Sequence, residues 1–376
     1  MRRIHNLTSC ATGLVAISLL LGACAGVAPS APSPSPSPHP AVDPISGIPL
    51  PCDELFPISD RAQLLGVSEG LETPHFDDPL LVGESARLTE AGGEYCEWVG
   101  PSAGVESVGL GLAVLPDVTA EITDYPHAIA GTDAEALRDA FGTGSVVSCD
   151  GYPDSEISNC TVSVLVAENY WVDGYVAVPS SGGIEGITTF LNALDSRLRS
   201  TEARADPVFT PPSDALGMGL DCHAIETSSA FKAQPLFAAL APAQPADQSS
   251  PPIWRVASNR VSATNCTWPL PSQEGLDIQG GERLDPLTVS VTPGGEWYWP
   301  TLAELANGDS LPDPYKPVNI LHATDALMRD GGELCNLLVL VDQSVVTIQT
   351  RTQTGSHDAC AAALEAFDIV RTVAAV

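Results

Sequence analysis

Two serines lie in patterns that resemble catalytic motifs. Ser102 is the centre of Gly-Pro-Ser-Ala-Gly, residues 100–104, which matches the Gly-x-Ser-x-Gly elbow of serine hydrolases. That elbow needs a strand before the serine and a helix after it, but the residues after Ser102 predict a second strand, so we interpret the motif as a hairpin turn. Ser229 and Lys232 have the Ser-x-x-Lys spacing of penicillin-recognising enzymes, without the Ser-Asp-Asn and Lys-Thr-Gly elements that complete such a site. The sequence therefore predicts no catalytic residue and no enzyme.

Metal ligands are equally sparse in the sequence. Asp150, Asp154 and Glu156 lie between Cys149 and Cys160, and clustered carboxylates in a loop closed by cysteines could bind Ca²⁺ through hard oxygen ligands. The loop lacks the twelve-residue calcium pattern, so a solvated turn is the preferred interpretation. The histidines beyond the N-terminal segment show none of the spacings of zinc sites, and we predict no metal and no cofactor. They are His39, His75, His127, His223, His322 and His357.

The densest aromatic cluster is Glu-Trp-Tyr-Trp-Pro at residues 296–300. Trp297 and Trp299 could stack on the sugar rings of a cell-wall glycan, with Glu304 or Asp309 contacting hydroxyl groups. In the alternative interpretation, one ring enters the core and the other lies over the start of a helix. Trp297 and Trp299 are the only ligand-binding residues that the sequence suggests.

The N-terminus predicts export and lipidation. Arg2 and Arg3 precede an apolar run at residues 11–23 that is too short for a transmembrane helix, which is typical of a secretory signal peptide. The run ends in Leu-Gly-Ala-Cys, and small residues before Cys24 resemble the bacterial lipobox, in which the thiol is diacylated after cleavage. An uncleaved anchor is the alternative. Residues 24–51 are rich in proline and serine and predict an extended stalk.

The composition excludes some partners. The chain has 47 acidic residues, against 16 Lys and Arg, and a net charge of -31. Removal of the signal peptide takes away two more arginines, so neither nucleic acid nor an anionic lipid surface is expected to bind by electrostatic attraction. We expect the membrane to be contacted through the N-terminal lipid alone. An envelope protein or a ligand remains as the other partner.

The cysteine spacing indicates a duplication. Cys52 and Cys96 are separated by 44 residues, and so are Cys222 and Cys266. Thirteen residues from Cys160 align without a gap on those from Cys335, and the closing helix of each copy has the same apolar face. We therefore expect two tandem repeats, at residues 52–200 and 218–376, joined by a linker at residues 201–217.

Eight cysteines in an exported chain predict disulfides, and pairing within each repeat leaves nine combinations. The apolar periodicity places Cys360 on the buried face of the last helix, from which it can reach Cys335. In the first repeat, Cys160 corresponds to Cys335, and Cys149 is its available partner. We predict four pairs: Cys52 with Cys96, Cys149 with Cys160, Cys222 with Cys266, and Cys335 with Cys360.

Each repeat predicts an α+β unit. A cysteine beside a short helix is followed by a strand with Cys-x-Trp, a second strand, a helical stretch, a β-hairpin and a long final helix. Trp98 and Trp268 are expected in the core beside their disulfides. Alternation along the hairpin, as at Val162, Val164 and Val166, predicts a mainly antiparallel sheet with one face buried under helices.

This cysteine framework resembles a family of uncharacterised actinobacterial lipoproteins. The second repeat matches at Cys222, Cys266 with Trp268, Cys335 and Cys360, and the first at Cys52, Cys96 with Trp98, and Cys160. The family has no agreed activity, so the resemblance implies a location on the outer face of the cell membrane and a fold, but no mechanism.

Taken together, the sequence predicts a tethered cell-envelope lipoprotein that is not an enzyme. Its two disulfide-containing domains would bind a small apolar ligand or a protein partner. The alternatives are a cell-wall hydrolase or glycan-binding protein with an unrecognised site, and a structural or sensory accessory of a membrane complex.

Overall fold

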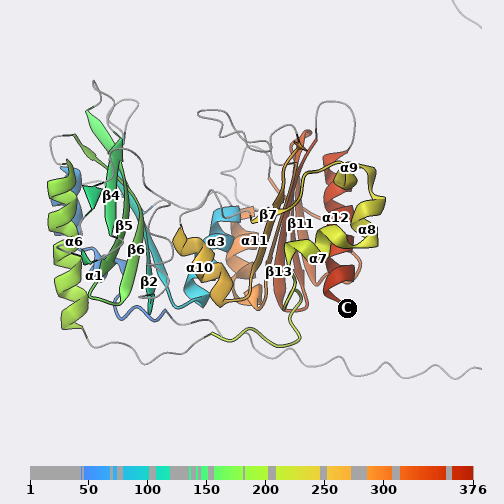
Figure 1. The fold of residues 1–376 in the computed structure, drawn as a ribbon, viewed down its shortest axis with the longest axis horizontal. Coiled ribbons are helices and arrows are strands. Elements are labelled where there is room, and N and C mark those ends of the chain that lie inside the picture. Colours follow the sequence, from blue (N-terminus) through green and yellow to red (C-terminus); the bar gives the residue numbers. More distant parts are fainter. Residues whose placement is uncertain are drawn as a thin grey trace, which may run out of the picture. The chain divides into compact units, whose positions relative to one another are not determined.

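The computed structural model describes residues 44, 46–67, 71–73, 79–100, 107–118, 135–136, 141–142, 145–150, 156–180, 183–201, 209–245, 252–271, 286–306, 314–352 and 358–375. Its fold is α+β, as predicted, with two antiparallel sheets (Figure 1). The signal peptide, the lipidation site Cys24 and Ser102 lie outside these ranges. Among the helices that are described, none has the length and apolarity needed to cross a membrane.

Sheet 1 contains six strands from the first repeat, in the order β1-β2-β6-β5-β4-β3, and all pairs are antiparallel. Their bounds are β1 Glu94–Val99, β2 Gly109–Pro116, β3 Glu135–Ala136, β4 Val146–Asp150, β5 Ile157–Val166 and β6 Tyr170–Pro179. The helices of this repeat are α1 Cys52–Leu55, α2 Ile58–Leu65, α3 Pro79–Glu90 and α6 Gly183–Ser200.

Sheet 2 contains seven strands from the second repeat, in the order β10-β11-β12-β13-β9-β8-β7. Their bounds are β7 Gln244–Pro245, β8 Thr264–Trp268, β9 Leu287–Thr292, β10 Lys316–Pro317, β11 Asp325–Asp330, β12 Leu334–Val341 and β13 Ser344–Arg351. Its helices are α7 Cys222–Thr227, α8 Ser229–Ala233, α9 Pro235–Ala238, α10 Pro252–Arg260, the 3-10 helix η3 Gly295–Tyr298, α11 Trp299–Ala306 and α12 Ala359–Ala374.

The two sheets share one strand order. Counted from the strand with Cys-x-Trp, β1-β2-β6-β5-β4-β3 corresponds to β8-β9-β13-β12-β11-β10, and β7 is an addition at the edge. A duplication would produce this correspondence. The outermost strands on the far side were not predicted. Glu135–Ala136 form β3, although they belong to the stretch between the second strand and the hairpin that is expected to be helical.

Four disulfides join the pairs that the sequence predicts, Cys52 with Cys96, Cys149 with Cys160, Cys222 with Cys266 and Cys335 with Cys360. Four disulfides in one chain are typical of an oxidising compartment outside the cytoplasm. Trp98 and Trp268 are buried in the core of their repeat, as expected. Trp98 packs against Phe56, and Trp268 against Phe231.

The outer face of each sheet is covered by helices of its own repeat (Figure 1). In α6, the spacing of Ile187, Leu191, Leu194 and Leu198 places these side chains on one face, where they meet the valines of β5 and β6. In sheet 2, α12 does the same, and Asp358 caps its first turn by accepting from the backbone N–H groups of Cys360 and Ala361.

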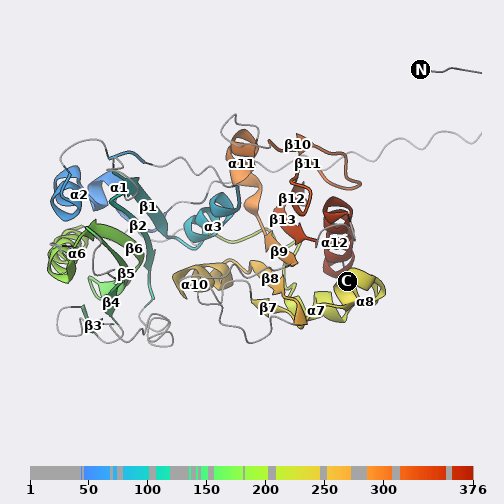
Figure 2. The same ribbon diagram turned by 90° about the horizontal axis from the view of Figure 1, so that it is seen from above.

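Parts of the inner faces of both sheets are buried as well, which corrects the prediction of a single covered face. Figure 2 shows α3 and α10 between the two sheets, and each of these helices packs against elements of both repeats. Ile253 and Val256 of α10 pack against Leu115 and Trp171 of sheet 1. In the opposite direction, Val82 of α3 joins the apolar cluster formed by α11 and the inner face of sheet 2.

Hydrogen bonds reinforce these contacts between the repeats. Arg87 of α3 is buried and donates from Nη1 to Oγ of Ser290 in β9, over 2.6 Å. Arg260 of α10 donates to the carbonyl oxygens of Pro116 and Asp117, over 2.8 Å each. Besides the core that each repeat forms on the outer face of its own sheet, the two repeats therefore share two apolar clusters.

The hairpin turns differ in length between the repeats. Val166 pairs with Tyr170 across three turn residues, whereas Val341 pairs with Ser344 across two. The predicted gap-free alignment of the two hairpins therefore holds up to the turn, and the strands after the turn are shifted by one residue relative to it. Asp342 and Gln343 have φ of 44° and 60°, as a two-residue type I′ turn requires.

The folded part begins before the predicted end of the stalk. Ile48 is 1% exposed and belongs to the core over sheet 1, and the Gly47 N–H donates to the Gly92 carbonyl over 2.8 Å. At the predicted linker, Leu216 packs into the core of sheet 2. Both connecting segments thus end in residues that the cores bury.

Candidate functional site

The residues singled out in the sequence do not form a site together. Ser229 and Lys232 are exposed on α8, and no hydrogen bond between them occurs among the described contacts. Asp154 lies outside the described ranges. Within those ranges, no group of three or more His, Cys, Asp or Glu side chains is placed to hold a metal ion.

Trp297 and Trp299 do not form an exposed platform. Trp299 is 6% exposed, packs into the cluster between α11 and sheet 2, and donates from Nε1 to Asp325. Trp297 is half-buried against the same cluster and donates from Nε1 to Glu90 over 2.8 Å. The two rings therefore do not form a shared exposed surface, and this placement counts against stacking of a sugar on both.

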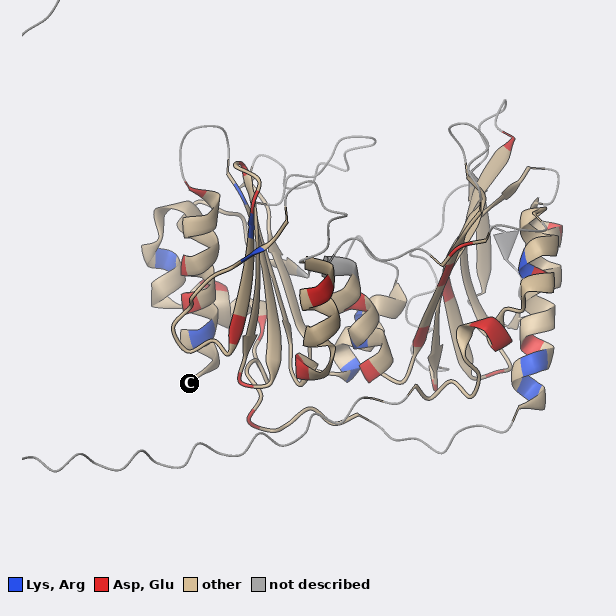
Figure 3. Cartoon of the chain, turned by 180° about the vertical axis from the view of Figure 1, so that it is seen from behind, with Lys and Arg blue, Asp and Glu red and all other residues tan. Residues whose placement is uncertain are grey.

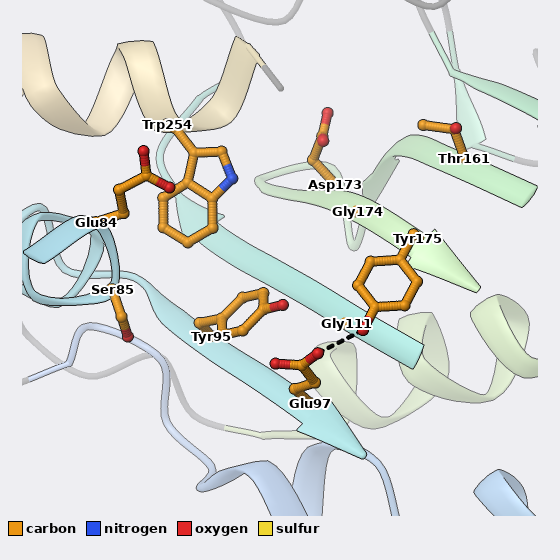
Figure 4. Close-up of a pocket in the computed structure, with 10 residues that line it drawn as sticks. All are labelled: Glu84, Ser85, Tyr95, Glu97, Gly111, Thr161, Asp173, Gly174, Tyr175 and Trp254. Atoms are coloured by element: carbon orange, nitrogen blue, oxygen red, sulfur yellow. Dashed lines mark hydrogen bonds between the residues drawn. The ribbon is translucent and has the colours of Figure 1, made fainter. Parts of the chain in front are cut away.

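A cavity of about 410 Å³ lies on the inner face of sheet 1, beside the apolar contact with α10 (Figure 4). This volume is in the range of roughly 300–1,000 Å³ that is usual for small-molecule sites. The cavity is lined by three aromatic side chains, three carboxylates, two glycines and two hydroxyl side chains. These are Tyr95, Tyr175 and Trp254; Glu84, Glu97 and Asp173; Gly111 and Gly174; and Ser85 and Thr161.

Strand alternation explains why polar residues line this face. In β1, Cys96 and Trp98 point into the outer core, so Tyr95 and Glu97 point to the inner face. In β6, Val172 and Val176 belong to the outer core, and Asp173 lies on the other face between them. The described strands of sheet 1 contain no Lys or Arg, and in Figure 3 this sheet, at the right, has red bands only.

Gly111 keeps the floor of the cavity open. A Cβ atom at this position would lie 2.5 Å from the Tyr95 hydroxyl oxygen and 2.5 Å from Cε1 of Tyr175. Gly174, on the neighbouring strand, has φ of 154°, and a Cβ there would meet the Gly111 carbonyl oxygen at 2.0 Å. The two rings therefore lie over a part of the sheet that only glycine can form.

Asp173 is the most deeply buried carboxylate of the cavity. It is 1% exposed and accepts from the Ser163 hydroxyl at Oδ2 over 2.8 Å, while Trp171 donates from Nε1 to the same hydroxyl oxygen over 2.9 Å. Its Oδ1 has no hydrogen-bond partner among the described residues. Burial raises the pKa of Asp173 to about 7, although the Ser163 hydrogen bond opposes the shift.

Glu97 interacts with both tyrosines. The Tyr175 hydroxyl donates to Oε1 of Glu97, as the dashed line in Figure 4 marks. Burial, reinforced by this neighbouring carboxylate, raises the pKa of Tyr95 and of Tyr175 well above the usual range. Both phenols are therefore neutral at physiological pH and act as hydrogen-bond donors and apolar walls.

The remaining wall comes from the other repeat. Trp254 of α10 faces Tyr95, with ring centroids 5.5 Å apart and an interplanar angle of 54°. In Figure 4 the indole projects from α10 towards the strands that bear Tyr95 and Tyr175. Glu84 and Ser85 of α3 line the side next to Tyr95. Helices from both repeats are thus needed to complete the cavity.

The corresponding face of sheet 2 has different chemistry. The paired strands show that the positions of the cavity residues are occupied there by neutral side chains, which bond to one another. Thr267 and Thr288 share a hydrogen bond of 3.2 Å, and Gln349 donates to Asn336 over 3.0 Å. By this register Glu97 corresponds to Thr267, Gly111 to Thr288, Asp173 to Thr347 and Tyr175 to Gln349.

Comparison of the chain with protein-family models, with curated proteins and with solved structures finds no match. The cavity is therefore interpreted from its own chemistry. It offers aromatic faces, carboxylates and hydroxyl groups, and none of its ten described lining residues is Lys, Arg or His. Such a site can enclose a small molecule and favours one that is neutral or positively charged.

Proposed function

We propose that the protein is a lipid-anchored binding protein of the cell envelope, without catalytic activity, and that the cavity on sheet 1 binds a small molecule. The observation that carries the proposal is that elements of both repeats line this cavity. Sheet 1 provides its floor, and α3 and α10 provide its walls. The cavity has the size of a small-molecule site, and its lining includes a buried carboxylate whose Oδ1 has no hydrogen-bond partner among the described residues.

Ligand binding can be tested on the full chain in a non-ionic detergent. A library of small neutral, anionic and cationic organic molecules would be screened by thermal shift, because a ligand that binds only the folded state raises the unfolding temperature. We expect a subset to raise it in the wild type and to lose the effect in Trp254→Ala. Stabilisation that is identical in Trp254→Ala would place the ligand elsewhere.

The anchor is a separate part of the proposal and rests on the sequence around Cys24. We expect the mature protein to start at a diacylated Cys24 and to sediment with membranes. Cys24→Ala should release the chain from the membrane or leave its signal peptide attached, as seen by mass spectrometry of the N-terminal peptide. An unmodified Cys24 in the membrane fraction would contradict lipidation.

A glycan-hydrolysing enzyme is the second candidate, because Asp173 and Glu97 line one cavity and burial raises the pKa of Asp173 to about 7. A carboxylic acid that stays protonated near neutral pH, together with a second carboxylate, is the arrangement that glycosidases use. Release of reducing ends from cell-wall glycan, abolished by both Asp173→Asn and Glu97→Gln, would favour this candidate over binding alone.

A further inference from the structure

The charge of the cavity indicates which class of small molecule it takes. Its three carboxylates come from three elements, Glu84 from α3, Glu97 from β1 and Asp173 from β6. Arg87 Nη2 lies 3.9 Å from Glu84 Oε1, and the Tyr175 hydroxyl donates to Glu97. None of the ten described lining residues is a Lys, Arg or His, so the side chains that line the cavity include acids but no base.

We propose that this cavity binds an organic ammonium cation, with the Asp173 carboxylate as its counter-ion and the rings of Trp254, Tyr95 and Tyr175 as its walls. This inference rests on the proposed function, since it names the ligand class of the same site.

Asp173 provides the first argument. Its side chain is 1% exposed, so an ionised carboxylate there has lost its hydration, and no described residue bonds to Oδ1 in place of the water. The Ser163 hydroxyl satisfies Oδ2 only. Asp173 lines the cavity, so a cation bound there would bring the opposite charge close to this carboxylate, which is stable in its ionised form only when it is paired or hydrogen-bonded.

The aromatic rings provide the second argument. A cation within about 6 Å of a ring centroid is attracted by the negative face of the ring, most strongly for tryptophan, and the attraction grows when water is excluded. Trp254 and Tyr95 line the cavity, and their ring centroids are 5.5 Å apart. Tyr175 lines it from β6, where it pairs with Gly111 of β2. Several rings around one space are typical of sites for alkylated ammonium groups.

The size and lining argue against a bare metal ion. A metal needs several ligands around one point, and no three His, Cys, Asp or Glu side chains among the described residues are placed to hold one. The cavity of about 410 Å³ has aromatic walls, which suit the carbon substituents of an organic cation. Sheet 2 shows that this lining is specific to one repeat, since Thr267, Thr347 and Gln349 replace the charged and aromatic side chains there.

Proton release should accompany binding. Burial raises the pKa of Asp173 to about 7, so the carboxyl is partly protonated at neutral pH and must ionise to pair with a cation. The titratable groups that face it across the cavity are Glu84 of α3, Glu97 and Tyr95 of β1, and Tyr175 beside it on β6. We expect affinity to rise by up to about tenfold per pH unit below pH 7 and to level off above it.

The experiment uses isothermal titration calorimetry on the full chain in a non-ionic detergent. The probes are choline and tetraethylammonium, and the control ligand is 3,3-dimethylbutanol, a neutral molecule with the shape of choline. We expect both cations to bind and the neutral alcohol to bind at least about tenfold more weakly. Asp173→Asn and Trp254→Ala should each weaken cation binding about tenfold or more.

Matched variants make the outcome decisive. Glu185→Gln removes an exposed acid from α6, on the opposite face of sheet 1, and should leave cation affinity unchanged. Thermal unfolding checks that each variant is folded, and Glu97→Gln replaces Asp173→Asn if the latter does not fold. Unchanged affinity in a folded cavity variant would overturn the proposal.

The two proposals can fail separately. If the neutral alcohol binds as well as choline, or if only neutral library members bind in a manner that requires Trp254, the cation proposal is wrong and the binding function stands. If no molecule of any charge shows binding that depends on Trp254, both proposals are wrong.

Discussion

Glu90, at the C-terminal end of α3, should make the stability of the protein depend on pH. The side chain is 2% exposed, accepts a hydrogen bond from Trp297 at Oε1, and has no described partner at Oε2. Burial raises the pKa of Glu90 to about 8, against the lowering effects of the Trp297 hydrogen bond and of the Arg87 charge. The folded state therefore binds a proton more tightly than the unfolded state does.

The sign and size of the effect follow from this difference. Because the folded pKa lies above the unfolded value of 4.5, the stabilisation by the proton is complete below about pH 4.5 and is lost as the pH rises to about 8. Integrating over the window from about pH 5 to about pH 8.5 gives a loss on the order of 4 kcal/mol in the free energy of unfolding. That is a large part of the stability of an ordinary domain.

Glu90→Gln tests this expectation, because glutamine keeps the size and the hydrogen-bond acceptor for Trp297 but cannot ionise. We would measure urea unfolding of the full chain by tryptophan fluorescence across this pH window. The free energy of unfolding of the wild type should fall relative to that of Glu90→Gln by roughly 4 kcal/mol towards high pH. Asp173 titrates in the same range, but it is present in both proteins, so its contribution cancels when the two free energies of unfolding are subtracted.

The control is Glu365→Gln, which removes an exposed carboxylate from α12 and should leave the pH dependence unchanged. Parallel stability curves for the wild type and Glu90→Gln would refute the reasoning, since they would mean that Glu90 reaches water or a cation in the folded state.

Three further predictions concern the cavity and the disulfides. Gly111→Ala places a methyl group 2.5 Å from the Tyr175 ring, so we expect a loss of about 1–3 kcal/mol in urea unfolding and weaker ligand binding by calorimetry; full binding would show that the rings can move aside. Ser163→Ala removes the hydroxyl that donates to the buried carboxylate of the cavity, and the pH midpoint of choline binding should move upward, whereas a downward shift would contradict this role. Replacing both Cys335 and Cys360 by serine opens a 25-residue loop and should lower the free energy of unfolding by roughly 3 kcal/mol under oxidising conditions, with no difference expected after reduction of both proteins.

The sequence predicts the framework of the fold well because the cysteines and the apolar periodicity act locally. The equal spacing of 44 residues identifies both pairs that join the first helix to the Cys-x-Trp strand. The spacing of Ile187, Leu191, Leu194 and Leu198 predicts the buried face of α6. Each of these signals lies within one repeat, where a single chain pattern determines the contact.

The cavity could not be predicted in the same way, because its residues come from elements far apart in the chain. Alternation assigns Tyr95 and Asp173 to one face of the sheet, but it does not show what covers that face. The covering side chain, Trp254, belongs to the other repeat. A signal was nevertheless present: Asp173 is the single charged residue in a strand of otherwise apolar, aromatic and glycine residues, and such a residue marks a polar site within a core.

Because α10 of the second repeat completes a cavity on sheet 1 within one chain, the cavity is independent of protein concentration. If each repeat were a separate chain, the wall formed by Trp254 would have to arrive by association, and the site would disappear on dilution. With α3 and α10 in one polypeptide, a single tethered molecule holds a complete site even where it is scarce on the membrane. Because the two repeats are parts of one chain and not two copies of it, their sequences can differ, and only sheet 1 needs to keep the charged lining.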